Sequence, residues 1–220
     1  YLVLAALPPR YRDPVHPLPA TAHHLRPPRP AAAGTPPWTV ARPGAPTVYF
    51  TLGTVFNTES GALLEHAVSA LGALPVNLVV TVGHAIDPAA LGPQPPHVHV
   101  ARHIPQAEIL PHCDGVVSHG GSGSVIGAIA HGLALVVMPL GADQPWNADR
   151  CVALGLGEAL DAVQATPADL QGAVIRVLGE PRYRRNAEQL RAELETLPGV
   201  SAAVGLLERL ASERQPITPR

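Results

Sequence analysis

The stretch Gly115-Val116-Val117-Ser118-His119-Gly120-Gly121-Ser122-Gly123-Ser124 decides the fold of this chain. It begins as a short apolar strand, continues as a glycine-rich turn and leads into the apolar residues Val125 to His131, which predict a helix. The N–H groups at a helix start have no intrahelical partner and lie at the positive end of the helix dipole. The turn therefore predicts a site for a phosphate or diphosphate.

A purely structural turn is the alternative, because α/β domains often place small residues where a strand turns sharply into a helix. Two more specific phosphate-binding motifs are absent, because this stretch lacks the residues that they require. A P-loop needs a Gly-Lys-Ser/Thr ending, and the dinucleotide fingerprint needs three glycines in the first βα unit. A serine hydrolase is disfavoured because Gly-x-Ser-x-Gly does not occur here, position 124 being Ser.

Strands and helices alternate on both sides of this stretch. Apolar runs predict strands at 47–52, 76–82, 98–101, 115–118, 134–138 and 157–160. Apolar stripes predict helices at 59–71, 106–110, 122–131, 147–154, 167–178, 181–197 and 200–210. The alternation predicts an α/β fold with a doubly wound parallel sheet of the Rossmann-like kind. Ligands of such sheets bind at the carboxyl ends of the strands, where Gly53-Thr54 and His119 to Ser124 are expected.

The first 46 residues differ from the rest. Twelve of the 26 prolines fall there, and the segment shows no apolar periodicity able to build a core. We expect an extended, partly polyproline-like linker over residues 1–46, a folded domain over 47–212 and a flexible tail over 213–220. The start, Tyr1-Leu2-Val3-Leu4, resembles neither a secretory signal nor an initiator segment, so we expect the interior of a longer protein.

Bulk composition excludes several classes of function. The net charge of -2 argues against a nucleic-acid partner. No apolar run approaches the roughly 18 residues of a membrane span. Cys113 and Cys151 form neither a metal spacing nor a disulfide framework, which predicts a cytoplasmic protein.

Further polar residues are expected at the same edge of the sheet. Asp143 and Gln144 follow the strand that ends at Met138 and could bind the hydroxyls of a polyol, or Asp143 could simply cap a helix. His103-Ile104-Pro105-Gln106 follows another strand and could form a platform for a flat ring, or His103 could be a surface residue. No metal site is expected, because no carboxylate or Cys stands at close spacing to the His97, His99 and His103 set.

Three motifs in order carry a family resemblance: His103-Ile104-Pro105-Gln106, His119 to Ser124, and Asp143-Gln144-Pro145-Trp146-Asn147-Ala148. The chain resembles the C-terminal, donor-binding half of GT-B glycosyltransferases of the UDP-glucuronosyl/glucosyltransferase superfamily. It looks most like the bacterial enzymes that glycosylate macrolides, enediynes and other natural products, as in antibiotic biosynthesis. The resemblance covers about residues 47 to 212 and implies that residues 1–46 hold the last strand of the N-terminal half and the interdomain linker.

The resemblance implies a role for each matching residue. His103 stacks on the nucleobase, the Ile104 backbone pairs with the base edge, and Gln106 reaches the ribose. Asp143 and Gln144 bind the sugar hydroxyls. The diphosphate is held by the imidazole of His119, by the first loop and by the helix start, with these residues: Thr54, His119, Gly121, Ser122, Gly123 and Ser124.

Two departures bear on the donor. Plant-type members have Trp where this chain has His103, and Glu, which binds the ribose diol, where it has Gly127. The missing carboxylate favours a thymidine diphosphate (TDP) sugar over a uridine diphosphate (UDP) sugar.

The implied reaction is an inverting sugar transfer, without a metal or other cofactor, to a hydroxyl of a small molecule held by the N-terminal half. The general base of the family, a His oriented by an Asp in that half, has no counterpart in this chain, so the fragment alone is expected to be inactive. A GT-B sugar-nucleotide epimerase and a non-catalytic nucleotide-sugar-binding module are the alternatives. The acceptor, the sugar and the oligomeric state are not encoded in these motifs.

Overall fold

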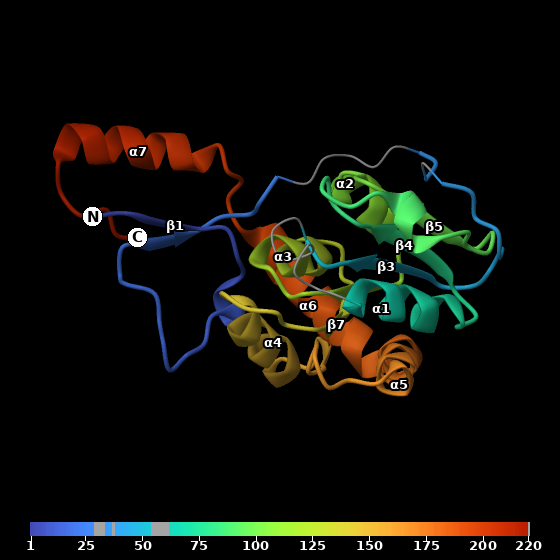
Figure 1. Cartoon of the computed structure of the whole chain (residues 1–220). Coiled ribbons are helices and arrows are strands. Elements are labelled where there is room, and N and C mark those ends of the chain that lie inside the picture. The colour runs from blue at the N-terminus through green and yellow to red at the C-terminus, as the bar shows by residue number, and fades with distance from the viewer. Residues whose placement is uncertain (29–33, 37, 54–61, 220) are drawn as a thin grey trace.

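A six-stranded parallel sheet forms the centre of the protein. Figure 1 shows the chain as a computed structural model, which describes residues 1–28, 34–36, 38–53 and 62–219. The strand order is β5-β4-β3-β6-β7-β8. The order steps outward from β3 in one direction and from β6 in the other, which is a doubly wound arrangement and confirms the predicted fold class. The strands are β3 (Thr47–Thr51), β4 (Asn77–Thr81), β5 (Val98–Ala101), β6 (Gly115–Ser118), β7 (Ala134–Val137) and β8 (Gly157–Ala159).

Helices cover both faces of this sheet. They are α1 (Leu63–Gly72), α2 (Gln106–Ile109), α3 (Ser122–Ala130), α4 (Gln144–Ala153), α5 (Pro167–Gly179) and α6 (Pro181–Thr196), whereas α7 (Ala202–Glu213) lies apart from this sheet (Figure 1). The described residues also include the 3₁₀ turns η1 (Pro9–Tyr11), η3 (Pro88–Leu91) and η4 (Leu110–His112). Among the described residues, none of the helices has the length and apolar character needed to cross a bilayer.

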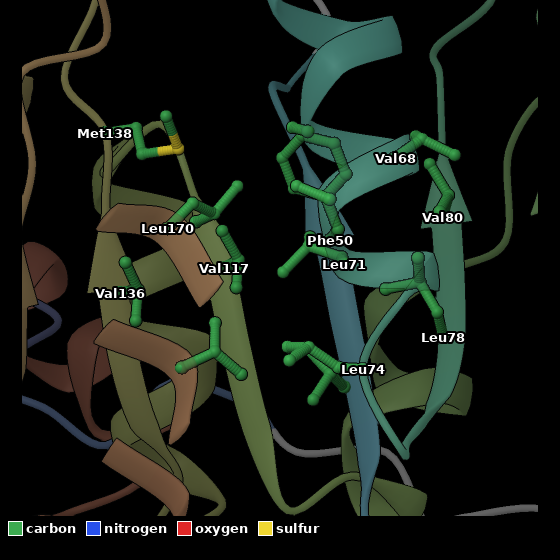
Figure 2. Close-up of a cluster of buried hydrophobic side chains, with 14 of the residues drawn as sticks. Phe50, Val68, Leu71, Leu74, Leu78, Val80, Val117, Val136, Met138 and Leu170 are labelled. Carbon is green, nitrogen blue, oxygen red and sulfur yellow. The ribbon is translucent and has the colours of Figure 1, made fainter. Parts of the chain in front are cut away.

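The hydrophobic core has two layers because successive strand residues point to opposite faces. On one face Phe50, Val80 and Val117 pack under α1 and α5, as the sticks in Figure 2 show. On the other face Tyr49 and Val79 belong to a second cluster, which includes apolar residues of α2, α3, α4 and α6. Burial on both faces explains why these strands are near-continuous apolar runs in the sequence.

The register of the strands brings three loops to one place. Thr51 at the end of β3 pairs with Ser118 at the end of β6, and Ser118 pairs with Val137 at the end of β7. The three strands therefore end level, and the segments that follow them lie at one edge of the sheet.

Most predicted elements lie within three residues of the observed ones, but α4 starts at Gln144 and not at Asn147. Pro145 lies in its first turn, where a proline's missing N–H costs nothing. The described part of α1 begins at Leu63, and its predicted start at Glu59 lies outside the described residues.

Residues 1–46, where the sequence shows no apolar periodicity, contribute both strands and buried residues. β1 (Val3–Ala5) and β2 (Ala22–His24) form a second, two-stranded parallel sheet. Tyr11 and Trp38 are buried in the second core cluster. Their partners lie far away in the sequence, so no local periodicity reveals them. Extended backbone at Pro8 and Arg12, with φ near -65° and ψ near 140°, does match the polyproline-like part of the prediction.

Residues 213–219, for which the sequence predicts a flexible tail, contact the rest of the chain. Glu213 is the last residue of α7, and Ile217 is buried at 1% exposure. The N–H of Ile217 donates to the carbonyl of Tyr1 at 2.8 Å, and its carbonyl is 3.0 Å from Nε2 of His23. This end of the chain is therefore held against the β1–β2 sheet, close to the N-terminus (Figure 1).

Candidate functional site

The turn between β6 and α3 is built around Gly120. Its φ of 84° lies in the left-handed region, and a Cβ there would stand 2.5 Å from Cγ1 of Val137. Its N–H is held by the Ser118 hydroxyl at 3.2 Å. Both conformation and space require glycine here, so the abrupt entry into α3 is fixed by the sequence.

His119 is seated between two glycines. A Cβ on Gly53, after β3, or on Gly121, at the start of α3, would lie 2.6 Å from Nε2 of His119. Gly121 is the N-cap residue of α3 and supplies no side-chain cap to the first N–H groups. The imidazole thus lies beside the open end of a helix, with Nε2 directed at the two glycines.

The environment of His119 is poor in polar partners. Its Nδ1 is buried and has no hydrogen-bond partner among the described residues. Burial lowers the pKa of His119, and the nearby Asp143 carboxylate opposes that shift. The ring is therefore predominantly neutral at neutral pH, and added negative charge nearby would favour its protonation.

Asp143 is the N-cap residue of α4, and its side chain reaches the start of α3. Its Oδ2 accepts hydrogen bonds from the Ser122 hydroxyl at 2.6 Å, from the Ser122 N–H at 3.3 Å and from Nδ2 of Asn147 at 2.9 Å. The Ser122 hydroxyl is the main reason why the pKa of Asp143 is lowered. This helix start consequently accepts a carboxylate, as expected for an anion site.

Gln144 stabilises the loop that follows β7. Its side chain is buried, and Oε1 accepts from the N–H groups of Leu140 and Gly141 at 2.7 and 3.1 Å. The same loop contains Ala142 in a left-handed conformation, with a φ of 54°. The amide oxygen of Gln144 is thus used to shape the loop, and its Nε2 is the group with donors to offer a ligand.

A cavity of about 440 Å³ adjoins the turn, a size typical of ligand pockets. It is lined by Gln106 of α2, by Ser122, Gly123 and Gly127 of α3, and by the prolines at 27–28. Nε2 of Gln106 donates to the Ser124 hydroxyl at 3.1 Å and so joins α2 to α3.

Gly127 brings α2 and α3 close together. A Cβ at this position would lie 3.1 Å from Cδ1 of Leu110 and 3.2 Å from Oε1 of Gln106. The space beside Gln106 thus holds no side chain from position 127.

His103 lies at the other end of the region, after the edge strand β5. Its ring stacks on that of His84, with the centroids 5.0 Å apart and the planes inclined by 18°. Arg102 donates to the carbonyl of His84 at 3.0 Å and pairs with Asp87 at 3.4 Å. Both imidazoles are exposed, so an open aromatic surface stands where the sequence predicted a platform.

The predicted site residues do not form one continuous set of contacts. Contacts join His119, Ser122, Gly121 and Asp143 in one group and Gln106 with Ser124 in another. His103 contacts His84. Thr54 lies outside the described residues. Asn147 was missed as a site residue although it stands four positions after Asp143, a spacing that places both on one helix face.

The structure offers no metal cluster within the part of the chain that it describes: no group of three or more His, Cys, Asp or Glu side chains could hold an ion. Nε2 of His97, one of the histidines considered from the sequence, is 2.8 Å from the carbonyl of Gly72.

Comparison with known families gives one match over most of the chain. The model described as "Erythromycin biosynthesis protein CIII-like, C-terminal domain" matches residues 65–210. This range includes most of α1, the glycine-rich turn at 119–124, Asp143 and Gln144, and α6.

Two similar curated proteins come from bacteria. The chain is 32% identical over 190 residues to demethyllactenocin mycarosyltransferase of Streptomyces fradiae, covering 86% of this chain and 41% of the relative. It is 40% identical over 178 residues to 4'-demethylrebeccamycin synthase of Lentzea aerocolonigenes, covering 80% and 41%. The chain therefore spans less than half the length of these relatives.

Solved structures share the fold. The calicheamicin glycosyltransferase CalG4 superposes with a TM-score of 0.82 at 26% identity, over 98% of this chain and 55% of that one. The spinosyn rhamnosyltransferase SpnG complexed with thymidine diphosphate superposes with a TM-score of 0.80 at 28% identity, over 94% and 56%. The sheet and its helices are thus those of a GT-B C-terminal domain.

Proposed function

Because the chain belongs to the family of erythromycin biosynthesis protein CIII-like C-terminal domains, we propose that it is the donor-binding part of an inverting glycosyltransferase. The enzyme would move a sugar from a nucleoside diphosphate to a hydroxyl of a small natural product. One observation carries the proposal: His119 is seated between two glycines beside a helix start that already holds a carboxylate. A diphosphate needs a ring nitrogen that can donate and the N–H groups of a helix start.

The reaction creates negative charge at this place. The acceptor oxygen forms a bond to the anomeric carbon, and the bond from that carbon to the diphosphate oxygen breaks. The electron pair leaves with the nucleoside diphosphate, and the acceptor proton passes to a base. We assign the leaving charge to His119, to the dipole of α3 and to the amides of Ser122 and Gly123, without a metal.

Asp143 and Gln144 are proposed for the sugar. Three donors share Oδ2 of Asp143, which leaves Oδ1 as the oxygen that accepts from a sugar hydroxyl. Nε2 of Gln144 can donate to a neighbouring hydroxyl. The Gln144 loop is fixed before the donor arrives, so binding does not need to order it.

A TDP sugar is the proposed donor. The ribose of UDP has a 2′-hydroxyl, for which Gly127 offers no carboxylate beside Gln106. The similarity to SpnG, solved with thymidine diphosphate, supports the same choice. Because a strong contact to the ribose is missing, we assign recognition of the base to His103 and to the backbone of Ile104.

The general base is proposed to reside in the N-terminal half of the complete enzyme. The chain spans 41% of each of the two curated relatives, and the acceptor pocket is assigned to the rest. The 220 residues alone are therefore expected to bind the donor and not to turn it over.

Calorimetric titration of this chain with TDP and UDP tests the proposal. We expect TDP to bind, UDP to bind more weakly, and His119→Ala to weaken both. Failure of both nucleotides to bind would overturn it. In the complete enzyme, conversion of the sugar nucleotide into its epimer without an acceptor alcohol would instead indicate an epimerase, and nucleotide binding without any turnover would indicate a binding module.

A further inference from the structure

The turn η1 is held against α4, the helix that follows Asp143. The guanidinium of Arg150 donates to the main-chain carbonyls of Tyr11, Arg10 and Arg12, at 2.9, 3.1 and 3.3 Å. The guanidinium of Arg12 lies 5.2 Å from the ring centre of Trp146. These contacts hold a proline-rich segment against the helix that carries Asn147.

Tyr11 inserts from this segment into the domain. Its side chain is 2% exposed, and its ring meets Trp146 edge-on with the centroids 5.8 Å apart. Its hydroxyl donates to Oδ1 of Asn147 at 2.9 Å, across 136 positions of sequence. Burial raises the pKa of Tyr11, so the hydroxyl keeps its proton and remains a donor.

Asn147 links the Tyr11 hydroxyl to the anion site at the start of α3. With Oδ1 held by Tyr11, its amide nitrogen Nδ2 faces the turn and lies 2.8 Å from the Gly120 carbonyl, 3.2 Å from the Ser122 hydroxyl and 2.9 Å from Oδ2 of Asp143. Without the Tyr11 hydroxyl, Oδ1 would be a buried acceptor with no donor, and the amide would lose the contact that sets its orientation.

We propose that Tyr11 is a positioning residue for the diphosphate: through Asn147 its hydroxyl holds Gly120, Ser122 and Asp143 in the geometry that receives the ligand. The inference rests on the proposed function, since it concerns the same anion site. It also gives η1 a role in binding, because the site at the end of β6 is complete only when this turn is docked.

The test compares two tyrosine variants of the full chain. Tyr11→Phe removes one buried hydroxyl and should weaken TDP binding about 10-fold, the effect of roughly one hydrogen bond, while the affinity for thymidine stays unchanged. Tyr183→Phe is the matched control, since its hydroxyl donates to Glu158, which lies on β8, at 3.1 Å, and it should change neither affinity. Equal weakening of TDP and thymidine, or unchanged TDP affinity, would overturn the inference.

A double-variant cycle of TDP affinities gives a second measurement, which distinguishes the proposed route from a general loss of stability. If Tyr11 acts through Asn147, then Tyr11→Phe should cause no further loss of TDP affinity in the Asn147→Ala background. Fully additive losses would contradict the proposed route. Failure of the unaltered chain to bind TDP or UDP would count against the proposed function itself, whereas normal binding by Tyr11→Phe would remove the inference alone.

Discussion

The start of α3 and the histidine pair after β5 are built in opposite ways. At the helix start, His119 is enclosed by glycines, and Ser122, Asp143 and Asn147 bond to one another. At the other end His103 is exposed and stacks on the equally exposed His84. Preorganised donors act most strongly on charge, whereas an open ring offers moderate stacking. Under the proposed function, we therefore expect the affinity to come mainly from the diphosphate, with the base recognised by few contacts.

Removing the His119 ring is expected to have the largest effect. In the complete enzyme, His119→Ala should lower kcat by about 10²- to 10³-fold, because one donor to the developing charge is lost. Steady-state rates with saturating donor and acceptor measure this. If turnover were unchanged, the helix start would not be the place where the charge develops.

Crowding the same ring should have the next largest effect. The φ of Gly121 is -59°, which any residue can adopt, so Gly121→Ala acts through its Cβ, placed 2.6 Å from Nε2 of His119. We expect TDP affinity to fall about 10- to 100-fold, as for a lost hydrogen bond to a charged group, measured by calorimetry.

Gly205→Ala on α7 is the control for the Gly121 variant, because a Cβ there meets nothing within 4 Å. It should leave the affinity for TDP unchanged. If Gly121→Ala also left it unchanged, the seat of His119 would not matter for binding.

The tightly built region was also the more predictable one. The apolar strand 115–118 and the glycines after it are local signals, and parallel strands that end level bring Asp143 to the same edge. Sequence alone could therefore predict the sheet, the turn and the neighbours of His119. The hydrogen bonds of individual side chains could not be predicted. Gln144, for example, uses its amide oxygen to shape its own loop.

Contacts between distant segments could not be predicted. Tyr11 bonds to Asn147 across 136 positions, and Ile217 bonds to Tyr1 across almost the whole chain. A single buried aromatic or aliphatic residue leaves no period in the sequence, so the contacts of the first 46 residues with the core could not be predicted. The stacking of His84 on His103 joins two loops in the same way.

The pH dependence of TDP binding should show the charge effect at His119. Burial lowers the pKa of this ring in the free protein, and a bound diphosphate would raise it. Binding should therefore be strongest below the free-state pKa and weaken as pH rises through the pKa of the complex, by at most about 10-fold per pH unit. Titrations from about pH 5 to about pH 9 cover the range of histidine.

His119→Asn separates this effect from the titration of the phosphate itself. The variant should keep only the pH dependence that the diphosphate contributes. An equally steep profile in both proteins would show that His119 takes up no proton on binding.

The smallest effect is expected at the exposed pair. His103→Ala should weaken TDP about 5-fold, the lower end of what base stacking contributes, and His103→Trp, with a larger ring, should strengthen it. Because the contact is with the base, thymidine should lose the same factor as TDP, whereas His119→Ala should affect TDP alone. If His103→Ala lowered the affinity for TDP but not for thymidine, the region around His103 would also recognise charge. The proposed difference between the two regions would then be wrong.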